Sequence, residues 1–105
     1  MTERILRVWR GYGSAQGVKR YSDEYFAQTL LPELRALAGF VGATVRVRSD
    51  ATETQLVVQT IWESIHAIRA FAGEDVERAV VEPIVSEMLT RFDDRTAQYS
   101  IAHTG

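Results

Sequence analysis

The chain has 105 residues and a formal net charge of −2 at pH 7, and it contains no cysteine. This length allows one domain with a substantial core and is too short for two, so we expect a single domain over residues 1–105. Proteins that bind nucleic acids are usually basic, which argues against nucleic acid as a partner. Without cysteine the chain has no disulfide and no thiolate nucleophile, which fits a reducing cytoplasm.

The sequence also predicts no membrane partner and no metal. No apolar run approaches the length of a membrane span, and Met1-Thr2-Glu3-Arg4 lacks the apolar core of a signal peptide. The histidines are far apart and the carboxylates are scattered, so no metal-ligand spacing is recognisable. We therefore expect a cytoplasmic protein that binds neither a membrane nor a metal ion.

The first expected element is a strand from Arg4 to Tyr12 with apolar side chains on both faces. Ile5 and Trp9 alternate with Val8, so we expect both faces to be covered. Arg7 falls between Ile5 and Trp9. It is either paired or snorkelling at the sheet surface, or it contacts an anion or a carbonyl group inside a cavity.

A helix is expected from about Ser22 to Ala38, after a loose glycine-containing stretch that ends at Gly17. Ser22 is a suitable N-cap, and the acidic residues after it suit the positive end of the helix dipole. Pro32 cannot donate to the helical ladder, so we expect a kink or a restart near Leu31. An apolar stripe runs along this helix through Phe26, Leu30, Leu34 and Leu37.

Two runs of alternating residues, Phe40–Arg48 and Thr54–Trp62, predict a β-hairpin. The chain then turns a corner at Trp62-Glu63-Ser64, where the apolar spacing changes from that of a strand to that of a helix. Ser64 is expected to cap this second helix, and Gly73 suits the residue after its last turn.

The last third of the chain predicts shorter elements. Asp75 is expected to cap a further helix, and Pro83 either kinks that helix or starts a new segment. A loop over Phe92–Arg95 and a final strand over Thr96–Ala102 complete the chain.

The resulting order, β-α-β-β-α-β, predicts an α+β fold of the ferredoxin-like type, with a four-stranded antiparallel sheet and helices on one face. Apolar strand residues occur at both parities, so we expect the second face to be buried as well. One parity holds Ile5, Trp9, Val57, Ile61, Tyr99 and Ile101, and the other holds Leu6, Val8, Leu56, Val58 and Trp62. A C2 homodimer through the sheet face is the simplest solution.

Several segments resemble the antibiotic biosynthesis monooxygenase (ABM) superfamily, a group of dimeric α+β barrels. The matching segments are Arg7-Val8-Trp9-Arg10-Gly11, Ala38-Gly39-Phe40-Val41-Gly42, Ile61-Trp62-Glu63-Ser64, Ile68-Arg69-Ala70-Phe71-Ala72-Gly73-Glu74-Asp75, Arg91-Phe92-Asp93-Asp94-Arg95 and Gln98-Tyr99. The resemblance covers nearly the whole domain, and the tryptophan corner with its following helix is its most specific part.

The resemblance implies several activities, because the superfamily includes oxygenases that need no metal or flavin, and also haem-degrading enzymes. Both groups use an asparagine in their sites, and this chain contains none. The haem-degrading pattern also requires a histidine about three turns beyond the tryptophan, whereas His66 comes one turn after Trp62. We therefore expect no cofactor and no haem degradation.

Five residues are candidates for a site. Trp62 matches the family motif as a pocket wall and is equally suited to pack the corner of the core. Trp9 and Tyr25 are further candidate walls, with core packing as the alternative. Arg7 is a candidate to stabilise negative charge on a substrate oxygen. His66 is a candidate general base, although its position off the apolar stripe favours solvent exposure.

Two classes of function remain open. The first is a cofactor-independent monooxygenase that acts on an aromatic or polyketide-like molecule. The second is a non-catalytic dimeric module that binds a small hydrophobic ligand or stabilises an assembly. A cavity that holds Trp62 with Arg7 or His66 favours the first class, and a filled core with His66 in solvent favours the second.

Overall fold

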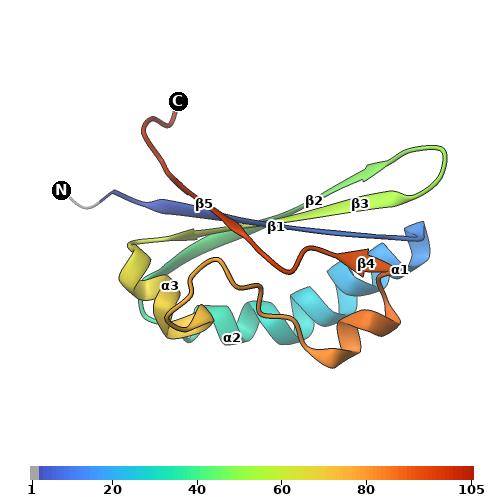
Figure 1. The fold of residues 1–105 in the computed structure, drawn as a ribbon, viewed down its shortest axis with the longest axis horizontal. Helices are drawn as coiled ribbons and strands as arrows, with labels where there is room; N and C mark the ends of the chain where they lie inside the picture. Colours follow the sequence, from blue (N-terminus) through green and yellow to red (C-terminus); the bar gives the residue numbers. More distant parts are fainter. Residues whose placement is uncertain (1–2) are drawn as a thin grey trace.

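The computed structural model describes residues 3–105, which form a sheet with helices packed against one face (Figure 1). The strands are β1 (Ile5–Gly13), β2 (Phe40–Ser49), β3 (Thr54–Trp62), β4 (Arg91–Phe92) and β5 (Ala97–Ser100). The helical elements are α1 (Ala15–Arg20), η1 (Tyr21–Leu30), α2 (Leu31–Arg35), α3 (Ile65–Ala72) and η2 (Pro83–Glu87). This arrangement confirms the predicted α+β ferredoxin-like fold class.

The sheet has five strands rather than the predicted four, because the last strand is divided. The order is β2-β3-β1, and both β4 and β5 pair with the free side of β1. All the pairings are antiparallel. Between β4 and β5 the chain leaves the sheet at Asp93–Thr96, and there the amide of Thr96 donates to the carbonyl of Glu77 instead. The last strand is therefore interrupted where its backbone bonds to the segment that contains Glu77 instead of to β1.

The register of the sheet corrects the predicted assignment of residues to its two faces. Arg7 lies opposite Thr60 and Trp9 lies opposite Val58, so odd residues of β1 share a face with even residues of β3. The helix-facing side holds Ile5, Trp9, Leu56, Val58 and Trp62, and the opposite side holds Leu6, Val8, Val57, Ile61 and Tyr99. The grouping by odd and even residue numbers was wrong because residue numbers do not determine the register between two paired strands, and the register decides which residues share a face.

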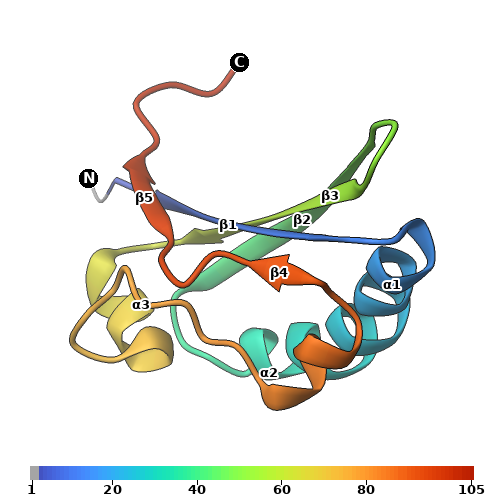
Figure 2. The same cartoon turned by 45° about the vertical axis from the view of Figure 1, so that its right-hand side comes forward.

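The first helix begins earlier than predicted. Ser14 is its N-cap and accepts a hydrogen bond from the amide of Gly17, so Ser22 lies inside the helix and is not a cap. Gly17 had indicated a loop, but here it allows close packing, because a Cβ at this position would clash with the carbonyl oxygen of Met88. Figure 2 shows α1 beside the chain that leads into β4.

The predicted restart near Leu31 is confirmed. Residues 21–30 are wound as a π-helix, in which the amide of Leu31 donates to the carbonyl of Phe26 five residues earlier. An α-helix, α2, follows from Leu31. Pro32 has no amide hydrogen, so it removes one bond from the ladder where the winding changes.

The corner that follows β3 forms as predicted. Ser64 caps α3 by accepting from the amide of Ala67 at 3.1 Å. Gly73 ends the helix with a φ of 88°, a conformation that favours glycine. The amide of Glu63 donates to the carbonyl of Gly39 at 2.8 Å and so ties the corner to the entry of β2.

The helix predicted after Asp75 does not form. Residues 73–82 have no regular helix, and we call them the cover segment. The Asp75 side chain accepts from the amide of Glu77, which closes a local turn rather than starting a helix. Pro83 starts a new segment, as one of its two interpretations predicted, and this segment is the short 3₁₀-helix η2.

Because Gly17 packs against Met88, we expect a Gly→Ala change at this position to destabilise the protein, the opposite of its usual effect in a helix. A Gly→Ala change inside a helix normally stabilises it by up to about 1 kcal/mol. We expect Gly17→Ala instead to lower the free energy of unfolding by about 1–3 kcal/mol, because the new methyl group overpacks against a backbone oxygen. Urea denaturation measures the change. Gln16→Ala, at an exposed position of the same helix, is the control, and an equal loss in both variants would contradict this packing account.

Candidate functional site

The elements α1, η1 and α2 follow one another without a break over residues 15–35, and we call this run the long helix. A small cavity lies between the helix-facing side of the sheet and the long helix. Its volume is about 40 Å³, and it is lined by Arg7, Trp9, Tyr21, Leu30, Leu34, Val58, Thr60, Phe71, Val80 and Thr96. Strands β1 and β3 supply one wall, the long helix supplies the opposite wall, and the cover segment contributes Val80. The lining is mainly apolar, with one charged group, Arg7.

Arg7 is 4 % exposed, and its guanidinium group is bound mainly to backbone oxygens. Nη1 donates to the carbonyl of Val76 and, at 2.8 Å, to Oε1 of Gln98. Nη2 donates to the carbonyl of Arg78 at 2.7 Å. The guanidinium carbon lies 5.8 Å from the ring centre of Phe71. The buried cation therefore fixes the cover segment to β1 and faces an aromatic ring.

The charge of Arg7 has no acidic partner in the part of the chain that the structure describes. Burial, and then the charge of Arg78, lower the pKa of Arg7 to about 10, so the group is still cationic at neutral pH. Backbone and amide oxygens accept three of its N–H groups. A buried charge is normally paired, so Arg7 is the candidate contact for an anionic group at this cavity.

Aromatic rings form one side of the cavity. The ring centre of Trp9 lies 5.7 Å from that of Tyr21, and its Nε1 donates to the carbonyl of Asp93 at 2.8 Å. Burial raises the pKa of Tyr21 well above its ordinary value. The Tyr21 hydroxyl therefore stays protonated and does not provide a base at neutral pH.

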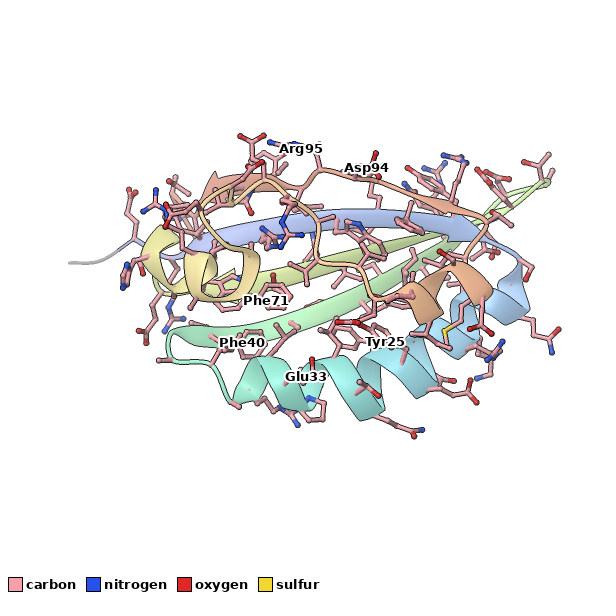
Figure 3. The ribbon with its side chains drawn as sticks, turned by 60° about the horizontal axis from the view of Figure 1, so that its bottom comes forward. Tyr25, Glu33, Phe40, Phe71, Asp94 and Arg95 are labelled. Atoms are coloured by element: carbon pink, nitrogen blue, oxygen red, sulfur yellow. The ribbon has the colours of Figure 1, made fainter. Side chains whose placement is uncertain are left out.

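The cover segment is also fixed from its other side, by the chain between β4 and β5. The amide of Thr96 donates to the carbonyl of Glu77 at 2.7 Å, and the amide of Ala79 donates to the carbonyl of Asp94 at 2.9 Å. On the surface, Arg95 forms a two-point ion pair with Asp75, with distances of 2.6 and 3.1 Å. Figure 3 shows Asp94 and Arg95 along the edge where these segments meet.

Of the five candidate residues, the structure brings Arg7 and Trp9 to the cavity. Trp62 is fully buried and does not line it. Its Nε1 donates to Oγ1 of Thr60 at 2.9 Å, and its ring stacks on Phe71 at 5.8 Å. Trp62 thus packs the corner and contacts two residues that line the cavity, Thr60 and Phe71.

Tyr25 and His66 lie elsewhere. Tyr25 is one turn beyond Tyr21, with a ring separation of 5.3 Å, and it lines a separate groove between the long helix and η2. His66 is exposed on α3 and is not part of the cavity lining. This confirms the solvent exposure favoured for His66 and leaves its role as a base without support from the geometry.

Several cavity residues were not predicted as site residues from the sequence, including Tyr21, Thr60, Phe71 and Thr96. Thr60 has the same strand parity as Trp62 and Val58, so a signal for its inward direction was present. Its position opposite Arg7 depends on the register. Thr96 comes from the break between β4 and β5; a loop over Phe92–Arg95 was predicted, but the contact of Thr96 with the cover segment is long-range and has no local signal.

The described residues contain no group of three or more histidine or acidic side chains that could hold a metal ion. Within residues 3–105, no helix has both the length and the apolar character needed to cross a membrane.

Comparisons with known proteins agree on the fold. No family model matches the chain, and no curated protein matches it in sequence. Among solved structures, it is similar to the Streptomyces coelicolor monooxygenase ActVA-Orf6, determined with nanaomycin D, with 18% identity, a TM-score of 0.68 and coverage of 98% of this chain and 90% of that one.

Two further structures give the same result. SnoaB, a cofactor-independent oxygenase from Streptomyces nogalater, has 16% identity, a TM-score of 0.60 and coverage of 99% of this chain and 97% of its own. A Bacillus cereus protein with the provisional name antibiotic biosynthesis monooxygenase has 13% identity, a TM-score of 0.66 and coverage of 98% and 97%. The predicted resemblance to the ABM superfamily is therefore confirmed at the level of the fold, and at these identities it establishes no activity.

The role of Arg7 in holding the cover segment can be measured directly. We expect Arg7→Met to increase the hydrogen-exchange rates of the Ala79 and Thr96 amides on the order of tenfold, because the segment loses buried hydrogen bonds. Amide exchange followed by NMR measures both rates. Arg10→Met, on the opposite face of β1, is the matched control. Unchanged rates in Arg7→Met would show that the other contacts alone hold the segment.

Proposed function

We propose that the protein is a cofactor-independent monooxygenase that acts on an acidic aromatic or polyketide-like molecule in the cavity beside Arg7. The observation that carries this proposal is a buried guanidinium group, without an acidic partner among the described residues, in an otherwise mainly apolar cavity. The fold shared with ActVA-Orf6 and SnoaB supports the proposal.

The chemistry requires little from the protein. An electron-rich phenolate or enolate reacts with dioxygen without a metal, and a methylene carbon flanked by aromatic rings is converted to a carbonyl. One oxygen atom enters the product, and the other leaves as water with the two hydrogens of the methylene group. The substrate supplies the four electrons. Arg7 would stabilise the anionic oxygen in a site with little water, where a fixed positive charge has its largest effect.

The cavity lining restricts the substrate. It contains no carboxylate and no histidine, and the pKa of Tyr21 is raised, so the lining offers no base near neutral pH. The substrate must then ionise with the help of Arg7 alone. This favours phenols and enols that are already acidic in water.

Substrate entry requires the cavity to open. Its volume is about 40 Å³, whereas a dry cavity of roughly 150 Å³ holds benzene. Val80 of the cover segment and Phe71 of α3 both line the cavity. We propose that the cover segment moves outward. The N–H groups of Arg7 then stop donating to the carbonyls of the cover segment and donate to the substrate instead.

The alternative is a non-catalytic dimeric module that binds a small molecule or stabilises an assembly. Two observations favour it: the small volume of the cavity and the exposure of His66. In this alternative, Arg7 has only the structural role of joining β1 to the cover segment.

The first experiment tests oxygenation. Metal-chelated protein and a hydroxyanthrone are incubated in air, and quinone absorbance and oxygen uptake are followed together. We expect one oxygen molecule consumed per quinone formed. We expect Arg7→Lys to lower kcat by about a hundredfold, because a point charge replaces a fixed planar donor.

Arg10→Lys, which lies outside the cavity, should retain the activity. Quenching of tryptophan fluorescence, to which Trp9 and Trp62 both contribute, measures binding separately from turnover. Binding without any oxygen uptake would select the non-catalytic alternative, and equal activity of the Arg7→Lys and wild-type proteins would remove Arg7 from the mechanism.

We further propose that two copies associate through the open face of the sheet. In the described chain no helix covers this face (Figure 1). Leu6, Val57 and Ile61 lie on it half-buried, and Tyr99, opposite Leu6, is 54% exposed. A second copy of the same face would bury these groups.

The second experiment tests this association. Sedimentation at micromolar concentration should give a dimer, and we expect Tyr99→Asp to raise its dissociation constant on the order of tenfold, since buried aromatic residues dominate interfaces. Val47→Asp is a matched control, because Val47 is 55% exposed but lies on the helix-facing side of β2. A stable wild-type monomer would refute the dimer.

A further inference from the structure

A second hollow lies between the long helix and the start of η2, where η1 and α2 face that short helix. It is an open groove of about 500 Å³, lined by Glu24, Tyr25, Thr29, Glu33, Glu82, Pro83, Ile84 and Met88. It shares no lining residue with the cavity of Arg7. Its volume falls in the range of small-molecule sites, roughly 300–1,000 Å³.

The groove is negative. Three carboxylates line it, and no lysine or arginine does. Glu24 forms an exposed ion pair with Arg20 at 3.1 Å. For Glu33 and Glu82, the structure of residues 3–105 shows no ion pair. Two carboxylates from different segments of the chain are thus free to bind a cation.

Tyr25 provides an independent observation. Its side chain is 93% buried, since only 7% is exposed, and among the described residues its hydroxyl has no hydrogen-bond partner. Every fully buried side-chain nitrogen and oxygen in the described chain has a partner, so this hydroxyl is accessible, and Tyr25 is part of the groove lining. Figure 3 shows Tyr25 between the long helix and the C-terminal part of the chain, with Glu33 further along the same helix.

The chemistry of Tyr25 indicates which ligand group it prefers. Burial, and then the charges of Glu82 and Glu33, raise the pKa of Tyr25 to about 12. The hydroxyl therefore stays neutral, and its oxygen can accept a hydrogen bond while the two carboxylates attract positive charge. A primary ammonium group, with three N–H donors, suits all three acceptors.

The remaining lining is apolar. Ile84 is 39% exposed and Met88 is half-buried beside it. These side chains offer contact to a hydrocarbon chain attached to the ammonium group. A ligand that is a bare cation would leave this surface unused.

We propose that this groove is a binding site for a primary alkylammonium ligand, whose charged end lies between Glu33, Glu82 and the hydroxyl of Tyr25, and whose apolar body lies on Ile84 and Met88. The site is distinct from the proposed oxygenation site in position and in charge preference. It binds cations, whereas the cavity of Arg7 favours anions.

The test is an NMR titration of the ¹⁵N-labelled protein with n-hexylamine, which is protonated at pH 7, alongside n-hexanol and hexyltrimethylammonium. We expect saturable shifts in the amides around Tyr25, Glu33 and Ile84 with hexylammonium. Affinity should be about tenfold weaker for hexanol, which lacks the charge, and intermediate for the trimethyl compound, which has no N–H donor.

Three variants assign the contacts. Glu33→Gln and Glu82→Gln should each weaken hexylammonium binding about two- to fivefold, as expected for a partly exposed ion pair. Tyr25→Phe keeps the ring and should weaken hexylammonium without affecting hexanol. Glu87→Gln, on η2 but outside the groove, is the matched control and should bind normally.

The site is refuted by three results. The first is the absence of saturable shifts with hexylammonium, and the second is equal affinity for hexanol. The third is a Glu87→Gln variant that loses as much affinity as Glu33→Gln, because binding would then reflect only the general charge of the surface. None of these outcomes depends on oxygenation in the cavity.

Discussion

The structure depends on the burial of one guanidinium group. Arg7 lies on the central strand, and its N–H groups donate to carbonyls of a segment about seventy residues away in the chain. A lysine could not reproduce this planar set of bonds. The cover segment has no regular helix of its own, so its position comes from these bonds and from the two amide bonds near β5. Held in this position, the cover segment contributes Val80 to the lining of the cavity.

The same arginine gives the cavity its chemical character. Its charge is opposed by no carboxylate of the described chain, and three carbonyl or amide oxygens solvate it instead. Such solvation is weaker than a full ion pair and leaves the group able to attract an anion. On a neighbouring face of the same helix, carboxylates and a neutral phenol line a groove of the opposite charge. The two proposed sites thus share one helix and differ in the charge of the ligand that they favour.

Local signals in the sequence predicted much of this fold. Thr54–Trp62, Ser64 and Gly73 were assigned correctly because alternation, capping and a positive φ are each decided within a few residues. The predicted start of the first helix was wrong because Gly17 was read as part of a loop. Glycine is instead needed at this position for a long-range contact with Met88, which the local sequence does not reveal. The site was predicted only in part. Arg7 and Trp9 were found on their own strand, whereas Thr60 and Thr96 reach the cavity through register and through a break in the sheet.

The division of the last strand into β4 and β5 has a consequence for the order of folding. Both strands pair with β1, although all the other strands and helices lie between them in sequence. Until these pairings form, this side of β1 is an exposed edge, and the cover segment lacks its two amide bonds to the connection between β4 and β5. Contacts of such long sequence separation form slowly. We therefore expect the cavity to be completed late in folding.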